Sequence, residues 1–117
     1  MWQAIVNWFK NLFNRQAPIH REKNGLWWQE DNGTVKVGLD SQVIDELGDI
    51  TFLETPQVDE TIDHNDQLID IEGGKAVETF KSPVKGKISR VYEDYQNDPA
   101  SLTKADNPLL VEIEPAK

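Results

Sequence analysis

One lysine in this sequence is placed where its amine could be chemically modified. Lys75 follows two glycines, and the flanking runs, Gln67 to Glu72 and Ala76 to Phe80, have the composition of short β-strands. A glycine pair tolerates the positive backbone angles of a tight turn. The sequence therefore predicts that Lys75 lies at or beside a hairpin tip, where its side chain extends into water and its amine is open to an acylating enzyme.

The lysine alone does not establish a function, because an exposed lysine beside a glycine pair usually belongs to an ordinary soluble loop. The rest of the chain offers no competing chemistry: no serine stands in a nucleophile elbow, no glycine-rich phosphate loop is present, and there is no cysteine. The run Asp63-His64-Asn65-Asp66 lacks the spacing of calcium ligands and is interpreted as a solvated turn. This pattern favours a carrier, in which an attached cofactor does the chemistry and the protein presents it.

Length and charge narrow the class of protein further. With 117 residues, the chain fits one compact module. The formal charge is −9, and because residues 1–23 carry four cations against one anion (+3), residues 24–117 carry −12. An acidic body repels phosphate backbones, which argues against nucleic acid, and attracts proteins with basic docking faces. The lack of cysteine gives no sign of an oxidising compartment, so we expect a cytoplasmic location.

The first 25 residues are expected to form a segment of their own. Apolar side chains recur within residues 2–14 at the three- and four-residue spacing of an amphipathic helix. Such a helix could pack on the domain, dock a partner protein or a second copy of the chain, or lie on a membrane surface. Pro18 would end the region that allows a helix, and polar residues up to Gly25 would form a linker. The stretch fails as a signal peptide and is too short and polar to span a bilayer.

From residue 26 onward, short strands alternate with turn signals, as in an all-β sandwich or barrel. Asp31-Asn32-Gly33 predicts a hairpin between strands at 26–29 and 34–39. Residues 40–48 predict one or two helical turns, which Asp40 or Ser41 could cap and Gly48 could end.

Strand alternation then places Ile50 and Phe52 on one face and Thr51 and Leu53 on the other. Further along, the proline-containing runs 97–99 and 106–108 break the chain before a closing strand at 109–113.

Four motifs of the β-rich body occur in an order that is more specific than any one of them. They are TVKVGLD at 34–40, LGDITFLETP at 47–56, EGGKA at 72–76 and SPVKGKI at 82–88. Together they resemble the glycine cleavage system H protein family over roughly residues 26–114. The resemblance implies a mostly β fold, a flattened barrel or sandwich of the biotinyl/lipoyl type. Residues 26–117 would then be a lipoyl-carrier domain with a short internal helix, preceded by the N-terminal helix and linker at residues 1–25, which are additional to the family pattern.

The resemblance also implies a cofactor and partners. In the family, lipoic acid is attached in amide linkage to the hairpin lysine, which is similar in position to Lys75. Glu72, Gly73, Gly74 and Ala76 would then form the hairpin that a lipoyl ligase or octanoyltransferase recognises. The arm would shuttle aminomethyl groups and reducing equivalents among glycine decarboxylase, an aminomethyltransferase and dihydrolipoamide dehydrogenase. The protein would be a carrier and not an enzyme, and no metal is implied.

Three alternatives stay open at this point. An H-like protein could donate lipoate to 2-oxoacid dehydrogenases, and an interaction module could use the helix at residues 2–14. A biotin carrier has a similar fold but usually has methionine on both sides of its lysine, where this chain has Gly74 and Ala76. The family usually places larger residues at the two positions before the lysine, so we expect Gly73 and Gly74 to make the tip looser.

Overall fold

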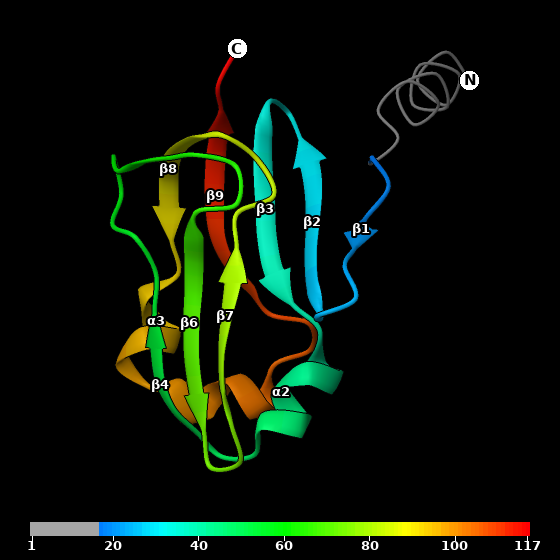
Figure 1. The fold of residues 1–117 in the computed structure, drawn as a ribbon, viewed down its shortest axis with the longest axis vertical. Coiled ribbons are helices and arrows are strands. Elements are labelled where there is room, and N and C mark those ends of the chain that lie inside the picture. The colour runs from blue at the N-terminus through cyan, green and yellow to red at the C-terminus, as the bar shows by residue number, and fades with distance from the viewer. Residues whose placement is uncertain (1–16) are drawn as a thin grey trace, which may run out of the picture.

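The computed structural model describes residues 17–117, which form two antiparallel β-sheets that pack face to face (Figure 1). The larger sheet has the order β1-β2-β3-β9-β8-β5 and the smaller one β4-β6-β7. The larger sheet contains β1 (His20–Arg21), β2 (Leu26–Asp31), β3 (Thr34–Leu39), β5 (Thr61–Ile62), β8 (Gly86–Val91) and β9 (Leu109–Pro115). The smaller sheet contains β4 (Ile50–Glu54), β6 (Gln67–Gly73) and β7 (Val77–Lys81). The mostly β sandwich predicted from the sequence is confirmed, whereas the predicted helix at residues 2–14 lies outside the described residues.

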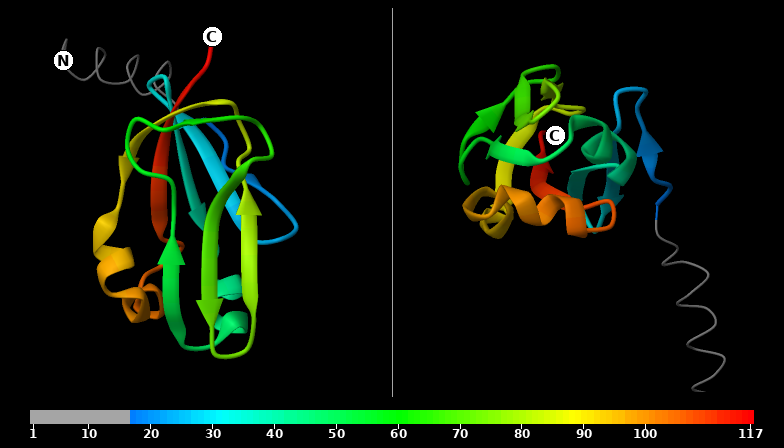
Figure 2. Two further views of the ribbon diagram at one scale, coloured as in Figure 1. Left: turned by 60° about the vertical axis from the view of Figure 1, so that its left-hand side comes forward. Right: turned by 90° about the horizontal axis from the view of Figure 1, so that it is seen from below.

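Three helical elements gather at one end of the sandwich. They are α2 (Ser41–Leu47), α3 (Glu93–Asn97) and the 3₁₀ helix η1 (Pro99–Lys104). The tip of the β6–β7 hairpin lies at this same end, opposite the C-terminus (Figures 1 and 2). The helical elements and the segment that the sequence singles out therefore share one end of the molecule.

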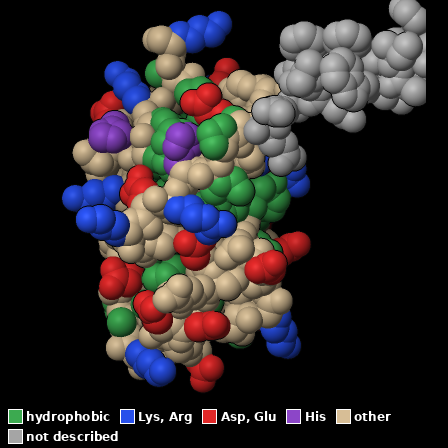
Figure 3. Space-filling view, turned by 90° about the vertical axis from the view of Figure 1, so that its right-hand side faces the viewer, with side chains coloured by type: hydrophobic (Ala, Val, Ile, Leu, Met, Phe, Trp, Pro, Cys, Tyr) green, Lys and Arg blue, Asp and Glu red, His purple; other side chains and the backbone are tan. Residues whose placement is uncertain are grey.

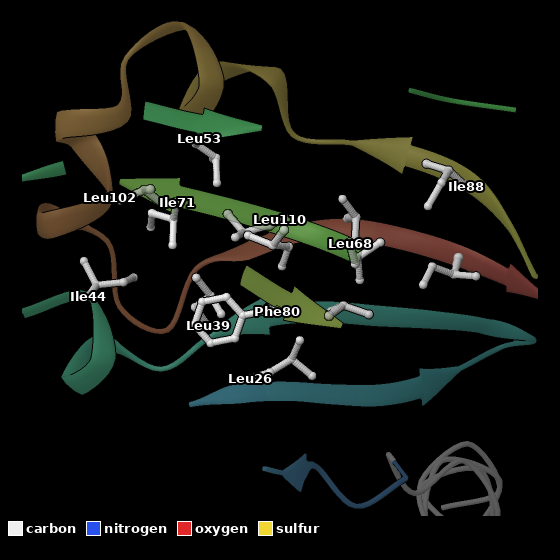
Figure 4. Close-up of a cluster of buried hydrophobic side chains, with 14 of the residues drawn as sticks. Leu26, Leu39, Ile44, Leu53, Leu68, Ile71, Phe80, Ile88, Leu102 and Leu110 are labelled. Atoms are coloured by element: carbon white, nitrogen blue, oxygen red, sulfur yellow. The ribbon is translucent and has the colours of Figure 1, made fainter. Parts of the chain in front are cut away.

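The core lies between the two sheets, where alternate residues of each strand point inward. On the larger sheet, Val35 and Val37 of β3 lie opposite Ile113 and Val111 of β9, and all four are buried. Phe80 of β7, in the smaller sheet, belongs to the same buried cluster and lies close to Leu39 in Figure 4. One face of each sheet thus supplies the hydrophobic core, which holds the smaller sheet and its hairpin in place.

Two local predictions are confirmed by the backbone geometry. Asn32 and Gly33 have φ angles of 51° and 81°, which fit the two-residue turn predicted between β2 and β3. The predicted internal helix is α2, and Gly48, with φ of 81°, ends it in a conformation that favours glycine.

The capping of α2 differs from the prediction, because neither Asp40 nor Ser41 caps it with its side chain. The carboxylate of Asp40 instead pairs with Arg21 of β1. The backbone N–H of Ser41 donates to Oδ1 of Asn107 at 2.9 Å, and the N–H of Asn107 donates to Ser41 Oγ at 2.8 Å. The free N–H at the start of α2 is therefore bonded by a side chain 66 positions away in the sequence. Local sequence patterns do not reveal such a partner.

The predicted alternation along β4 is wrong. The pairing of β4 with β6 shifts register between Ile50 and Phe52, which marks a β-bulge. Ile50 and Leu53 are buried as a result, while the side chain of Phe52 is 41% exposed on the other face. The bulge thus moves one large apolar side chain from the core to the surface.

The region between β8 and β9 is more ordered than the sequence predicts. It contains two short helices: the proline-containing break at 97–99 separates α3 from η1, and the break at 106–108 follows η1, whose Leu102 is completely buried. Strand β1 forms one edge of the larger sheet. It pairs with β2, and the His20 ring stacks on Trp28 with ring centroids 4.0 Å apart. Figure 3 views this side of the molecule, where hydrophobic side chains gather among interspersed acidic and basic ones. Part of the expected linker therefore belongs to the sheet.

Candidate functional site

Lys75 lies at the tip of the β6–β7 hairpin, as the sequence predicts. β6 ends at Gly73 and β7 begins at Val77, so the connection consists of residues 74–76. Lys75 is exposed, and no ion pair within residues 17–117 involves its amine. A primary amine on a flexible stem in this position is accessible to an enzyme that forms an amide with it.

The backbone of the tip is held in place by three consecutive amides. The N–H of Gly73 donates to the carbonyl of Ala76 across the hairpin, at 2.9 Å. The N–H groups of Gly74 and Lys75 donate to the carbonyls of Asp49 and Leu47, both at 2.9 Å. We call residues 47–49, which connect α2 to β4, the α2–β4 corner. The corner and the hairpin together fix the backbone from which the lysine side chain extends.

The glycines before the lysine have a role that the sequence does not predict. Neither Gly73 nor Gly74 adopts a positive φ, so the prediction that the pair serves a left-handed turn is wrong. A Cβ on Gly73 would lie 2.2 Å from the carbonyl oxygen of Leu47, whereas a Cβ on Gly74 would have no neighbour closer than 3.9 Å. Gly73 is therefore needed for the close approach of two backbones. The tip that was expected to be looser is instead braced by the corner.

A third glycine lies beneath the lysine stem. Gly48 has a positive φ of 81°, and a Cβ there would lie 3.2 Å from Cγ of Lys75 and 3.6 Å from its Cδ. The first part of the Lys75 side chain therefore passes over the end of α2. The sequence predicts Gly48 as a helix terminator, but its contact with the lysine becomes evident only in the fold.

Glu72 and Ala76, the other two predicted site residues, lie on either side of this tip. Glu72 is exposed in β6, and its carbonyl accepts a hydrogen bond from Oγ1 of Thr51 in β4, at 3.3 Å. Across the sheet, Glu72 is paired with Phe52 on one side and Val77 on the other. The structure thus brings all five predicted residues to one hairpin and adds Leu47, Gly48, Asp49 and Phe52, which sequence reasoning missed.

Surface grooves lie away from the lysine, around the loop that follows β4. One groove of about 590 Å³ is lined by the carboxyl groups of Glu54, Glu60 and Asp70 together with both polar and apolar neighbours, and a second of about 610 Å³ lies on the other side of the loop. Gln96 of α3 donates to Oγ1 of Thr55 at 2.7 Å and so ties the loop to the helical end. The sequence does not predict these grooves, because strands and helices far apart in the chain form them.

The polar run at 63–66 forms the turn between β5 and β6. The carboxylate of Asp66 accepts from the backbone N–H of Asp63 at 2.8 Å, and Asn65 has a positive φ of 72°. Among the described residues, no group of three or more His, Cys, Asp or Glu side chains is arranged to hold a metal ion. Within the same part of the chain, no helix is long and apolar enough to cross a membrane.

Two side chains outside the hairpin, Tyr92 and Lys36, have raised pKa values. Burial raises the pKa of Tyr92, and the hydrogen bond from its hydroxyl to Glu112 raises it further. The hydrogen bond between Lys36 and Asp31, at 2.9 Å, raises the pKa of Lys36. Lys36 lies in β3, and Tyr92 directly follows β8 and bonds to Glu112 of β9, so both groups bear on the stability of the fold and not on the hairpin.

The chain is similar, in both sequence and structure, to proteins of one known family. The family model described as "Glycine cleavage H-protein" matches residues 19–114. The chain is 37% identical to the probable glycine cleavage system H protein of Natronomonas pharaonis over 92 residues, which are 75% of this chain and 71% of the relative. It is also 37% identical to the glycine cleavage system H protein of Listeria welshimeri over 97 residues, 77% of this chain and 76% of the relative. The crystal structure of a glycine cleavage system H protein from Mycobacterium marinum superposes with a TM-score of 0.76 at 24% identity, covering 84% of both chains.

Proposed function

We propose that this chain, which belongs to the glycine cleavage H-protein family, is a lipoyl carrier whose lipoyl group is attached to Lys75. The observation that carries the assignment is the exposed lysine on a backbone held by three consecutive amide hydrogen bonds. An exposed amine gives an acylating enzyme access, and a fixed backbone gives the resulting arm a defined origin. A loop lysine of no function would need neither the brace nor the glycine that permits it.

The chain's own residues would supply attachment and presentation. In amide formation, Nζ of Lys75 as the neutral amine would attack the carbonyl carbon of an activated lipoyl group. The bond to the activating group breaks, that group leaves with the electron pair, and the nitrogen loses a proton, which removes the lysine charge. Once attached, lipoate supplies a dithiolane that accepts a group reductively and is regenerated by thiol–disulfide exchange. The α2–β4 corner keeps the backbone at Lys75 in place while the side chain and the cofactor swing between partners. The reaction chemistry then belongs to the cofactor and the partner enzymes, and the protein acts as their carrier.

The partners follow from the family. We assign glycine decarboxylase, an aminomethyltransferase and dihydrolipoamide dehydrogenase as the enzymes that use the arm, and a lipoyl ligase or octanoyltransferase as the enzyme that installs it. The acidic surface of residues 24–117 supports docking to proteins with basic faces. The cytoplasmic location stays a prediction from the cysteine-free sequence.

Intact mass spectrometry tests the assignment directly. We expect protein produced in lipoate-replete cells to gain one lipoyl group, and Lys75→Arg to gain none because arginine offers no acylable amine. Lys81→Arg is the matched control, since Lys81 is an exposed lysine of the same hairpin. A lipoyl group retained by Lys75→Arg would refute attachment at this residue, and unmodified protein throughout would refute the carrier function.

A further inference from the structure

The outward face of the smaller sheet carries two rows of side chains that the proposed function does not use. In the row nearest the tip, Phe52 of β4, Glu72 of β6 and Val77 of β7 lie side by side. The next row on the same face consists of Glu54, Asp70 and Thr79. Leu53 and Ile71, which alternate with these residues, are buried in the core, so both rows point away from it. We call these six residues the outer face.

The apolar residues of the outer face are concentrated beside the lysine hairpin. Among the described residues, four large hydrophobic side chains are exposed: Ile19, Phe52, Val58 and Val77. Two of the four flank Glu72 in a single row, with exposed fractions of 41% for Phe52 and 65% for Val77. The β4 bulge is what places Phe52 there, at the cost of a core position. A pair of exposed apolar side chains next to a modification site is the kind of surface that a partner buries.

The charge on the outer face has one sign. Glu54, Asp70 and Glu72 supply three carboxyl groups, and no lysine or arginine occupies either row. Oδ1 of Asp70 accepts from Oγ1 of Thr79 at 2.7 Å, while no ion pair within residues 17–117 involves Glu54 or Glu72. The second row leads into the groove of about 590 Å³, where Glu60 adds a further carboxyl group. A partner that covers the outer face needs basic side chains around an apolar patch.

The α2–β4 corner lies against the inner side of the hairpin tip, beneath the Lys75 side chain. Gly73 is paired with the buried Ile50, and its missing side chain would point at Leu47, so the α2–β4 corner closes the core side of the tip. Of the two faces of the hairpin strands, the core covers the inner one, so the outer face is the strand surface that a partner can contact beside Lys75. An enzyme that acylates the bare lysine must bring its active site to the hairpin itself, whereas enzymes that act on the end of a long arm can meet it farther away. The first kind of enzyme therefore has the greater need for contacts with the adjoining strands.

We propose that the outer face is the docking surface for the enzyme that acylates Lys75, a protein that presents an apolar patch ringed by lysine or arginine. This inference rests on the proposed function and specifies the partner for the same site. Phe52 and Val77 are buried on docking, the carboxyl groups steer the encounter, and the shared strands β6 and β7 direct Lys75 into the partner's active site. Phe52 and Val77 act on binding and take no part in the chemistry.

The test compares matched pairs of exposed apolar residues. A purified lipoate–protein ligase is supplied with lipoate and ATP, and modification is followed by intact mass. We expect Phe52→Thr/Val77→Thr to lower kcat/KM by about tenfold or more, mainly through KM, because buried apolar contacts contribute to binding. The control Ile19→Thr/Val58→Thr replaces residues with 47% and 48% exposure outside the outer face and is expected to stay within about twofold of the unaltered protein.

Charge gives a second measurement. The rate of acylation should fall as ionic strength rises, and Glu54→Gln should weaken that dependence, since exposed charges are screened by salt. Circular dichroism of each variant confirms that the fold is kept. If the unaltered protein is lipoylated and the Phe52/Val77 variant reacts at the same rate as its control, the docking surface is refuted and the carrier function stands. If the unaltered protein is not lipoylated at all, the docking surface and the carrier function are both refuted.

Discussion

The contact between Gly73 and the α2–β4 corner can be tested by adding a single methyl group. In Gly73→Ala the new Cβ would lie 2.2 Å from the oxygen of Leu47 and 2.8 Å from its carbonyl carbon, both backbone atoms that cannot rotate away. The hairpin must therefore move from the corner and lose the two hydrogen bonds that Gly74 and Lys75 donate to Asp49 and Leu47. At about 1 kcal/mol for each bond, the loss is about 2 kcal/mol.

Gly74→Ala is the control, because it adds the same methyl group to the adjacent position. Its Cβ would have no neighbour closer than 3.9 Å, and neither glycine has a positive φ. Both substitutions reduce the entropy of the unfolded chain by a similar amount, roughly 0.4–1 kcal/mol, so this contribution cancels between them. We therefore expect Gly73→Ala to be about 2 kcal/mol less stable to unfolding than Gly74→Ala.

Urea unfolding of the unmodified protein measures this difference, and hydrogen exchange at the amides of residues 74 and 75 reports on the tip itself. In Gly73→Ala these two amides should exchange faster than in Gly74→Ala, even if the displacement stays local. Equal unfolding free energies for the two variants, together with equally slow exchange at both amides, would show that the corner does not brace the hairpin.

Two further predictions concern the hydrogen bond of Tyr92 to Glu112 and the hydrogen bond at the start of α2. Tyr92→Phe should lower the free energy of unfolding by about 1 kcal/mol near neutral pH through loss of the hydrogen bond to Glu112. Because the folded-state pKa of Tyr92 is raised above 10.0, this stabilisation is complete below that pH and is lost as pH rises through the folded pKa. If urea unfolding showed the stability difference between the unaltered protein and Tyr92→Phe growing at alkaline pH, the assignment would be contradicted. Asn107→Gly keeps the positive φ of 45° but removes the cap on Ser41, so it should cost about 1 kcal/mol. Asn65→Gly, with φ of 72°, removes no such cap, and an equal loss of stability in urea would show that the Asn107 side chain contributes nothing.

Features encoded by neighbouring residues could be predicted from the sequence. The β2–β3 turn depends on Asn32 and Gly33 themselves, and the end of α2 depends on Gly48, because both need local positive φ angles. The lysine hairpin could also be predicted, from two short strands and the residues between them, although its glycines do not adopt the expected positive φ angles. The four ordered motifs indicated the family, and the comparisons confirm it.

Features that depend on distant residues could not be predicted. The cap on α2 comes from Asn107, and the reason for Gly73 is the carbonyl of Leu47, which lies in another element. The β4 bulge that exposes Phe52 follows from its pairing with β6, so strict alternation gave the wrong face. The proline-containing breaks were correctly placed as interruptions, but the burial of Leu102 that holds η1 in place requires the assembled core.

The brace at the hairpin tip also determines how strongly an attached cargo is concentrated near its partners. A tethered group samples a volume that grows steeply with the uncertainty in the position of its anchor, and its effective concentration at a docked active site falls accordingly. Two backbone hydrogen bonds to the α2–β4 corner remove the backbone's share of that uncertainty, leaving only the side chain and the arm to move. By ordering the backbone at the anchor, the corner raises the effective concentration of the attached group at the active site of each enzyme that docks.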